Sequence, residues 1–224
     1  MTISESDKQG LRADEIAAGL PDDFRHLPRW IAARYRTRDF ASAQDLAATI
    51  GTLAESAGHH PDLLVGWGYV EVRLSSHDVR DITRRDLRLA RQISTAAGAA
   101  SAHPEPAALQ LVEWGLDSWD QAEVRPFWRA LLGYPEDAQH DDEVVDPDDR
   151  GGPTIWFQNT DRHETPRQRF HPDVWVPVDQ APRRIEAALA AGGTLVSDDE
   201  APSFWVLADS QGNRACICTV QDRD

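Results

Sequence analysis

The chain has 224 residues, of which 41% are hydrophobic, and its formal net charge is −15 with a pI near 4.8. This length is enough for one large domain or two ordinary ones, and the acidic balance argues against a nucleic-acid surface, which needs clustered lysines and arginines. No apolar run approaches the roughly 20 residues of a membrane span, and the N-terminus lacks the apolar core of a signal peptide, so we expect a cytoplasmic protein without membrane contact.

The first part of the chain predicts a short helix, a pair of strands and a long helix. Residues 1–9 have the composition of a disordered leader, and residues 11–20 carry a short helical pattern. Residues 24–37 indicate two strands that are broken near a proline. From Asp39, a suitable N-cap, apolar side chains recur at helical spacing as far as Ala57, which predicts one buried stripe.

The long helix runs into two adjacent histidines, His59 and His60. Gly58 suits the left-handed residue that closes a helix, and Pro61 holds His60 in an extended conformation. We therefore expect both imidazoles just beyond the helix end and free to converge, with Glu55 one turn back and able to reach the first ring. The alternative interpretation is an ordinary polar helix end.

A strand and a second helix are expected next. Residues 67–76 alternate in polarity. The apolar side chains of one face are Val70, Val72 and Leu74. Trp67 and His77 share the other parity, so a regular strand would point them to the same side from its two ends. The second helix is expected to begin after Thr83, where Asp86 fits a capping arrangement as well as a role beside the histidines.

Small residues and prolines over residues 97–107 are typical of a linker. We therefore divide the chain into a first domain over 10–98, a linker over 99–107 and a second domain over 108–224. Each domain has the length to bury a core of its own.

The second domain predicts a repeated unit of strand, helix and further strands. The first copy is expected to contain a strand, a helix and a later strand over 109–116, 120–132 and 154–158. The second copy is expected to contain a strand, a helix and three strands over 173–178, 182–191, 194–197, 204–208 and 214–220. Two such units about sixty residues apart indicate an internal duplication.

Two features of this domain have competing interpretations. The stretch over 137–153 is expected to be a loop or hairpin tip, whose acidic cluster is either solvated or a site for a hard cation. The cluster consists of Asp141, Asp142, Asp146, Asp148 and Asp149. Cys216 and Cys218 would lie on one face of a strand, too close in sequence for a relaxed disulfide, and we interpret them as reduced core thiols rather than reactive or metal-binding ones.

The first domain resembles the pterin-4a-carbinolamine dehydratase family over residues 11–98. The resemblance rests on the spaced set Glu55, His59, His60, Pro61, Trp67, His77 and Asp86. It implies an α+β sandwich, an antiparallel sheet with helices on one face, which associates as a homodimer or homotetramer. The family has a glycine-rich turn after its second histidine, whereas this chain reads His77-Asp-Val-Arg-Asp-Ile-Thr83, a difference expected to affect turnover or substrate choice.

The same resemblance implies a reaction and the roles of the site residues. Water is eliminated from a 4a-hydroxytetrahydropterin, which requires a proton delivered to the hydroxyl on C4a and a proton removed from N5. By analogy His60 is the general base and His59 and His77 are the acids, because neutral and cationic imidazole coexist near pH 7. Glu55 would orient His59, Trp67 would wall the pterin ring, and no cofactor is implied. The substrate-binding residues would be Glu55, Pro61, Trp67 and Asp86.

The second domain resembles the glyoxalase/bleomycin-resistance superfamily, also called vicinal-oxygen-chelate proteins, over residues 107–222. The resemblance rests on the duplicated order and on the local phrases at 124–134 and 209–213. Metal enzymes of that superfamily carry His or Glu ligands on the first strand of each copy and on the closing strands. The corresponding positions here hold Glu113, His171 and Cys216, and no fourth ligand is evident near Trp156. Because such an incomplete set suits a divalent ion poorly, the sequence predicts no metal.

Other interpretations of this domain concern a bound small molecule. His171 would either contact a ligand in the cup of the sheet or cap a strand beside Pro172. The tryptophans either line such a cup or belong to the core. They are Trp114, Trp119, Trp128, Trp156, Trp175 and Trp205.

The leading hypothesis is a dehydratase that acts on pterin-4a-carbinolamine, fused to a glyoxalase-like module of unknown ligand. One alternative is a non-catalytic protein that binds or sequesters a small molecule. The other is a dimerisation module for a partner protein.

Overall fold

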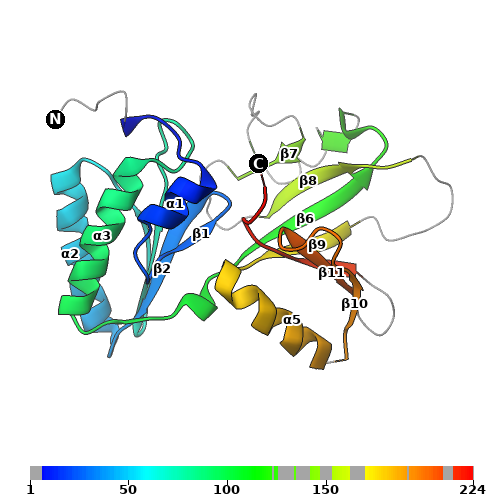
Figure 1. Ribbon diagram of the computed structural model, residues 1–224. Helices are drawn as coiled ribbons and strands as arrows, with labels where there is room; N and C mark the ends of the chain where they lie inside the picture. Colours follow the sequence, from blue (N-terminus) through cyan, green and yellow to red (C-terminus); the bar gives the residue numbers. More distant parts are fainter. Residues whose placement is uncertain are drawn as a thin grey trace. The chain divides into compact units, whose positions relative to one another are not determined.

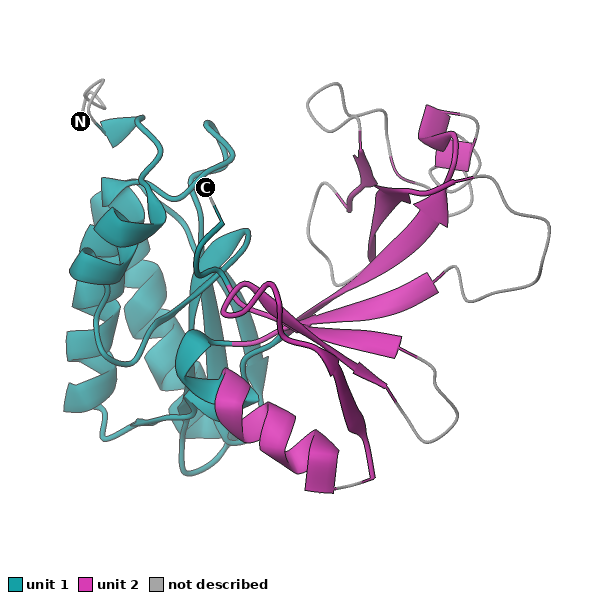
Figure 2. Ribbon diagram, turned by 45° about the vertical axis from the view of Figure 1, so that its right-hand side comes forward, with its two compact units in different colours: residues 1–110, 177–180, 220–224 teal, residues 111–176, 181–219 magenta. Residues whose placement is uncertain are grey.

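The computed structural model describes residues 7–122, 124–125, 134, 142–146, 153–161, 170–190, 192–208 and 214–223. The chain divides into two compact units, which Figure 2 shows in different colours: residues 1–110 with 177–180 and 220–224, and residues 111–176 with 181–219. Within the described part of the chain, no helix is both long and apolar enough to cross a membrane.

The first unit is an antiparallel sheet with two long helices on one face (Figure 1). Its elements are α1 (Ala13–Gly19), β1 (Arg25–Leu27), β2 (Trp30–Arg36), α2 (Phe40–Ala57), β3 (Asp62–Gly66), β4 (Tyr69–Leu74), α3 (Arg84–Ala99), β5 (His103–Pro104) and the 3-10 turn η2 (Pro106–Ala108). The strands follow the order β1-β2-β4-β3, and β5 pairs with β2. This arrangement confirms the predicted α+β fold of the first half.

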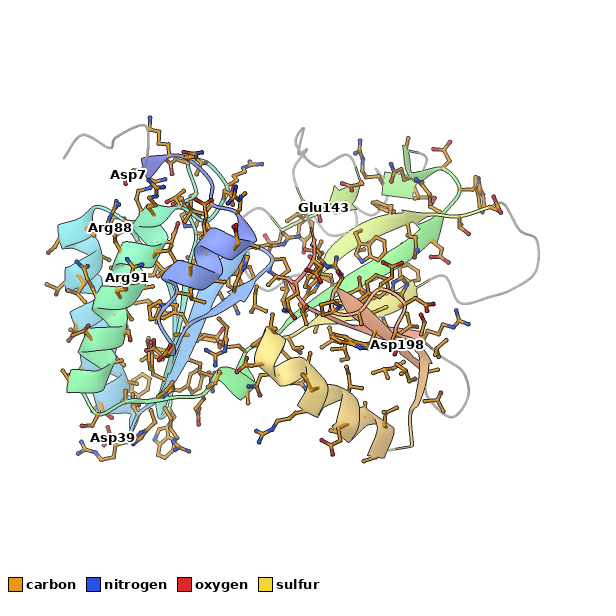
Figure 3. All side chains as sticks on the ribbon, viewed as in Figure 1. Asp7, Asp39, Arg88, Arg91, Glu143 and Asp198 are labelled. Carbon is orange, nitrogen blue, oxygen red and sulfur yellow. The ribbon has the colours of Figure 1, made fainter. Side chains whose placement is uncertain are left out.

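The predicted leader and the predicted linker both make contacts with the rest of the first unit. Residues 1–6 of the predicted leader lie outside the described residues, and Asp7 pairs with Arg88 of α3 at 2.7 Å (Figure 3). The predicted linker over 99–107 includes β5, whose residues His103 and Pro104 pair with Arg36 and Tyr35 of β2. The segment after α3 therefore contributes to the first sheet.

Helix α2 begins and ends where its capping residues predict. Asp39 Oδ1 accepts a hydrogen bond from the Ser42 N–H at 2.8 Å, and this bond is the main reason why the pKa of Asp39 is lowered to about 2. At the other end Gly58 takes a left-handed conformation with φ 60°, and its N–H bonds to the carbonyl groups of Ala54 and Glu55. The chain leaves the helix there and delivers His59 directly after the cap.

The core of the first unit lies between the sheet and the helices. The predicted apolar face of β4 is fully buried at Val70, Val72 and Leu74. The stripe of α2 supplies Ala43, Leu46, Ile50 and Ala54, and α3 supplies Leu87, Leu89, Ala90, Ile93 and Ala97. These side chains form one cluster, which fixes α2 and α3 on the sheet and so fixes the helix ends at which the histidine motif lies.

The strand predicted over 67–76 is shorter in the structure than expected. A separate strand, β3, lies before it, and a turn joins the two. Trp67 lies in that turn beside Gly68, which has φ 77°. His77 lies beyond the end of β4, in a turn that Ser76 and Asp81 close as an isolated bridge. The expectation that Trp67 and His77 mark the two ends of one regular strand is therefore wrong.

The second unit is a single sheet with the strand order β10-β11-β12-β9-β6-β8-β7. Its elements are β6 (Leu111–Ser118), β7 (Glu143–Val144), β8 (Thr154–Asn159), β9 (Phe170–Trp175), α5 (Ala181–Ala190), β10 (Thr194–Ser197), β11 (Phe204–Ala208) and β12 (Arg214–Cys218). The 3-10 turn η3 (Val178–Gln180) lies between β9 and α5 and is grouped with the first unit.

The strand pairing reveals the predicted duplication. The strands β6 and β9 are antiparallel neighbours at the centre of the sheet, and each pairs in parallel with the last strand of its own copy, β8 and β12 respectively. The second copy contributes four strands in the order β9-β12-β11-β10, and the described part of the first copy contributes β6-β8-β7. This topology confirms the glyoxalase-like fold of the second half.

Parts of three predictions fall outside the described residues. The helix predicted over 120–132 is helical at residues 121–122 and 124–125, whereas residues 123 and 126–132 and the turn over 209–213 are not described. Only Asp142 and Asp146 of the acidic cluster belong to the described residues, and Asp146 is buried. The adjoining β7 pairs with β8, as the predicted hairpin requires.

The two faces of the second sheet differ in chemistry. One face carries apolar clusters around Leu116, Ile155, Phe157, Val176, Leu207 and Ile217, and α5 packs against it. The strand register places Glu113, Gly115, His171, Asp173, Trp175, Cys216 and Cys218 on the opposite face. Both cysteines are buried, and neither forms a disulfide.

Candidate functional site

The centre of the site in the first unit is a buried pair formed by His59 and Asp86. The Nε2 atom of His59 lies 2.7 Å from Asp86 Oδ1, and the two residues are only 7% and 0% exposed. A carboxylate in hydrogen-bond contact with one ring nitrogen fixes the tautomer and the orientation of the imidazole. In the tautomer with the proton on Nε2, Nδ1 is the nitrogen that remains free to exchange a proton.

Asp86 also ties two other segments to this histidine. Its Oδ2 atom accepts hydrogen bonds from the Ser76 hydroxyl at 2.8 Å and from the Thr83 N–H at 2.7 Å. The bond from Thr83 is one half of the capping box of α3, and the Thr83 side chain also accepts from the Arg85 N–H. Asp86 therefore caps α3 and also lies in contact with His59.

The second histidine of the motif has a different partner and a different environment. His60 Nε2 lies 3.3 Å from Glu55 Oε1, and both side chains are exposed. The expectation that Glu55 orients His59 is wrong, because His59 turns inward to Asp86 while Glu55 stays on the exposed side of α2 with His60. The exposed pair stabilises the fold little, and it leaves His60 accessible to solvent.

The remaining members of the predicted set lie around these two pairs. His77 is exposed and follows Ser76, whose hydroxyl bonds to Asp86, so the carboxylate fixes the backbone next to this histidine. In the same turn Arg80 adopts a left-handed φ of 52°, where the family pattern has glycines. Pro61 is half-buried before β3, and Trp67 is 77% exposed in the turn after it.

Two contacts near the site had no counterpart in the sequence-based predictions. Ser76 is completely buried and joins β4 to Asp86, a role that depends on which segments meet in space. Arg85 is also buried, and its guanidinium pairs with Asp78 at 2.6 Å in the turn that carries His77. The Arg85 guanidinium is the main reason why the pKa of Asp78 is lowered.

In the second unit, the polar face of the sheet brings together three side chains that bear potential metal-ligating atoms. These residues are His171 and Asp173 of β9 and Cys216 of β12, and one ligand atom from each lies within 4.8 Å of the others. His171 and Cys216 belong to the predicted set, whereas Asp173 was missed. Its position directly beside Cys216 follows from the parallel register of β9 and β12, which the sequence pattern does not specify.

Glu113, the third residue of the predicted set, is differently engaged. Its Oε2 accepts a hydrogen bond of 2.6 Å from the indole N–H of Trp175, and both residues are buried. Glu113 lies directly opposite Asp173 in the antiparallel pair of β6 and β9. The buried face therefore holds two neighbouring carboxyl groups.

The protonation of this cluster is shifted by its own contacts. Contact with the Asp173 carboxylate raises the pKa of His171, and partial burial opposes that effect. The pKa of Cys216 is lowered, chiefly by a hydrogen bond from the Cys218 thiol, while burial acts in the opposite direction. Both shifts come from contacts among side chains on the same face of the sheet.

The tryptophans of the second unit do not behave as one group. Trp175 is buried, Trp114 and Trp119 are exposed, and Trp128 lies outside the described residues. Trp156 and Trp205 are half-buried. The ring of Trp156 meets that of His171 edge to face, with centroids 5.4 Å apart, so Trp156 belongs to the surroundings of the polar cluster.

Comparison with known proteins gives a separate match in each half of the chain. A family model described as Pterin 4 alpha carbinolamine dehydratase matches residues 9–96, and a model described as Glyoxalase-like domain matches residues 113–218. Both resemblances predicted from the sequence are confirmed by these matches. The candidate sites of the two units each lie inside one matched segment.

Individual relatives match the first half of the chain. Proteins named "Putative pterin-4-alpha-carbinolamine dehydratase" from Paracoccus denitrificans and Natronomonas pharaonis are 35% and 37% identical, and each match covers 39% of this chain and 86% or 95% of the relative. A solved structure of a transcriptional coactivator/pterin dehydratase from Brucella melitensis is 25% identical, covers 40% of this chain and all of that chain, and has a TM-score of 0.38.

Proposed function

Since the chain belongs to the pterin-4a-carbinolamine dehydratase family through its first half and carries a glyoxalase-like domain in its second, we propose that it dehydrates 4a-hydroxytetrahydropterins. The product is the quinonoid dihydropterin, and no cofactor takes part in the proposed reaction. The ligand of the glyoxalase-like domain is a separate question.

The reaction needs one proton to move in each direction. The hydroxyl on C4a leaves as water after it has received a proton, and N5 loses a proton as the new double bond forms. Imidazole groups suit both transfers because their neutral and cationic forms coexist near pH 7. Acid–base catalysis of this kind contributes roughly 10²- to 10⁴-fold.

The roles that we propose follow the contacts of the histidines. His60 is exposed beside Glu55 and is assigned as the general base toward N5. His59, held through Nε2 by Asp86, presents Nδ1 and is assigned as an acid toward the leaving hydroxyl. His77 is assigned the same role from the neighbouring turn.

The observation that carries the proposal is the position of Asp86 between the segments that supply the histidines. Its two oxygens bind His59 at the end of α2 and Ser76 next to His77. A single buried carboxylate thus orients groups from two segments that are distant in sequence. The capping box of α3 accounts for the bond from Thr83, whereas the bonds to His59 and Ser76 go beyond what a helix cap requires.

The other residues of the set are proposed to bind the substrate. Pro61 directs the chain from the histidines into β3, and Trp67 offers an exposed ring of the size of a pterin. We further propose that the protein acts in the cytoplasm as a homodimer or homotetramer, in line with the family resemblance.

The test is the rate at which a freshly generated 4a-hydroxytetrahydropterin disappears, followed by ultraviolet absorbance. We expect the parent protein to exceed the spontaneous rate and His60→Ala to lose about 10²-fold of the acceleration. His103→Ala changes another exposed histidine of the same unit and is expected to match the parent. Far-ultraviolet circular dichroism checks that each variant folds.

Two results would contradict the proposal. A parent protein that does not exceed the spontaneous rate is not a dehydratase, and calorimetric titration with a stable tetrahydropterin would then test the alternative of a binding protein. Equal losses in His60→Ala and His103→Ala would show that the measured acceleration does not come from the histidine motif.

A further inference from the structure

The metal site that the glyoxalase resemblance implies does not fit the residues of this chain. Of the four positions expected to supply ligands, Trp156 offers no ligating atom, and Glu113 is bound to the Trp175 indole. Only His171 and Cys216 remain, and both belong to the second copy. A site that draws its ligands equally from the two copies is therefore incomplete.

A different set of ligands is present on the same face of the sheet. Asp173 lies two residues after His171 on β9, so both side chains point to one face, and it lies beside Cys216 on the parallel strand β12. His171 Nε2 is 3.3 Å from Asp173 Oδ1, and the Cys216 sulfur completes a triangle with no side longer than 4.8 Å. Ligand atoms around a tetrahedral zinc ion lie about 3.5 Å apart, so small side-chain movements would close this triangle on an ion.

The electrostatics of the triangle favour a cation. Asp173 is 6% exposed, and its Oδ1 accepts no hydrogen bond within the described residues, although it forms the ion pair with His171. Glu113 adds a second buried carboxyl group directly opposite Asp173. Buried carboxylates cost several kcal/mol each unless a positive charge compensates them, and one imidazole shared among two carboxyl groups and a thiol compensates them only in part.

One further group points to a ligand at this place. The indole N–H of Trp156 is buried and has no hydrogen-bond acceptor among the residues that the structure describes. Its ring meets His171 edge to face on the same side of the sheet. A water or anionic ligand in the open position of a three-coordinate metal ion would supply the acceptor that this N–H lacks.

We propose that His171, Asp173 and Cys216 bind a zinc-class divalent ion, with the fourth coordination position open. The mixture of imidazole, carboxylate and thiolate donors suits zinc better than magnesium or calcium, which take oxygen ligands. Binding replaces the thiol proton of Cys216, which passes to solvent, and involves no change of oxidation state. The site belongs to the second unit alone and does not depend on the dehydratase proposal.

The test is titration of the full-length, metal-stripped protein with Co²⁺, which takes tetrahedral sites in place of zinc and gives coloured complexes. A thiolate ligand adds a charge-transfer band in the near ultraviolet, and the chain has only two cysteines to supply it. We expect one Co²⁺ per chain, the charge-transfer band, and loss of both signals on addition of Zn²⁺. This part of the experiment needs no variant.

Matched variants then separate the proposed ligands from their neighbours. Cys216→Ser is expected to abolish the band, and His171→Asn and Asp173→Asn are expected to weaken binding by at least about tenfold. Cys218→Ser keeps a hydroxyl that can donate a hydrogen bond to Cys216, and it is expected to keep the charge-transfer band. Glu113→Gln removes only a neighbouring charge and is expected to weaken binding less than Asp173→Asn does.

Three results would overturn the proposal. The first is a parent protein without the charge-transfer band. The second is a band that survives in Cys216→Ser and disappears in Cys218→Ser. The third is a loss in Glu113→Gln as large as that in Asp173→Asn, which would place the ion on the ligand positions that the superfamily resemblance implies.

Discussion

His59 and Asp86 are separated by 27 residues in the sequence, yet their side chains meet at 2.7 Å in the interior of the first unit. The contact links the end of α2 to the start of α3, because the same carboxylate completes the capping box of Thr83. Asp86 therefore has a structural and a proposed functional role, and a substitution can separate the two.

The first prediction concerns Asp86→Asn. The amide oxygen can still accept from the Thr83 N–H, but the amide nitrogen replaces an acceptor that contacts His59 or Ser76. We expect a loss of about 1–3 kcal/mol in the stability of the first unit, and a loss of about 10²-fold in dehydratase rate with an altered pH profile. Hydrogen exchange of α2 and α3 measures the stability, and the absorbance assay measures the rate.

The control for this prediction is Asp45→Asn, which changes an exposed aspartate of α2. It is expected to leave the stability and the rate unchanged. If Asp86→Asn lost stability while its rate and pH profile stayed those of the parent, Asp86 would serve the helix cap alone.

The second prediction concerns the bond between Tyr35 and Asp23. The Tyr35 hydroxyl donates to Asp23 Oδ2 at 2.5 Å, and the tyrosine is only 1% exposed, so burial raises the pKa of Tyr35 well above its usual range. Tyr35→Phe keeps the ring, which packs edge to face on Phe24, but leaves the carboxylate without this donor. We expect the first unit to lose about 1–3 kcal/mol, measured by hydrogen exchange in β2.

A double variant provides the check on that mechanism. Replacing both partners, in Tyr35→Phe with Asp23→Ala, removes the unsatisfied carboxylate and is expected to cost less than the sum of the single changes. Additive losses would show that the two side chains do not interact and would contradict the prediction.

Sequence reasoning located the first site because its signals are local. Asp39 and Gly58 specify the two ends of α2 through backbone contacts within one helical turn, and this places His59 and His60 beyond the helix. Thr83 specifies the start of α3 in the same way. Alternation of apolar residues likewise identified the buried face of β4.

The features that the sequence did not reveal depend on contacts between distant segments. β3 contains the continuous apolar run 63–65 rather than an alternating pattern, so the sequence did not reveal it as a separate strand. Its pairing with β4 places Trp67 in the turn between the two strands. The inward rotation of His59, which leaves Glu55 with His60, requires Asp86 from another helix. Asp173 joins the cluster of the second unit only because β9 and β12 are parallel neighbours.

The third prediction is a pH dependence that comes from His26. This half-buried residue of β1 has a lowered pKa, chiefly because burial disfavours the imidazolium, while Asp81 acts in the opposite direction. At pH values below 6.5, the ordinary pKa of histidine, His26 therefore binds a proton more readily in the unfolded chain than in the folded protein. The contribution of His26 to the free energy of unfolding is therefore fully present above this pKa. It is lost as the pH decreases below it, by at most about 1.4 kcal/mol per pH unit.

His26→Gln is expected to reduce this acid sensitivity. The measurement is the urea midpoint of the first unit in the parent and the variant at about pH 7.5 and about pH 5.5, with unfolding read by hydrogen-exchange pulses at one fixed pH. The difference between parent and variant should change with pH in the direction given above. A difference that is the same at both pH values would mean that the His26 imidazole does not titrate differently in the folded and unfolded chain.

The fourth prediction concerns Gly115, which lies directly opposite His171 in the pairing of β6 and β9. A Cβ atom at this position would lie 2.4 Å from Cε1 and 2.7 Å from Nε2 of the His171 ring, far closer than atoms can approach. Because a ring can rotate away while the strand stays in place, Gly115→Ala should displace the imidazole more than it destabilises the sheet. The displaced ring loses its contact with Asp173, so the pKa of His171, which this contact raises, should fall.

The pKa of His171 in Gly115→Ala can be followed by nuclear magnetic resonance without any metal, which separates this prediction from the proposed zinc site. Gly51→Ala is the matched control, because Gly51 belongs to α2 and a Cβ atom there would meet nothing within 4 Å. That change should stabilise the helix by about 0.5–1 kcal/mol and leave the His171 titration as in the parent. An unchanged His171 pKa in Gly115→Ala would contradict the prediction. It would mean that the position of the His171 ring beside Asp173 does not depend on the absence of a side chain at Gly115.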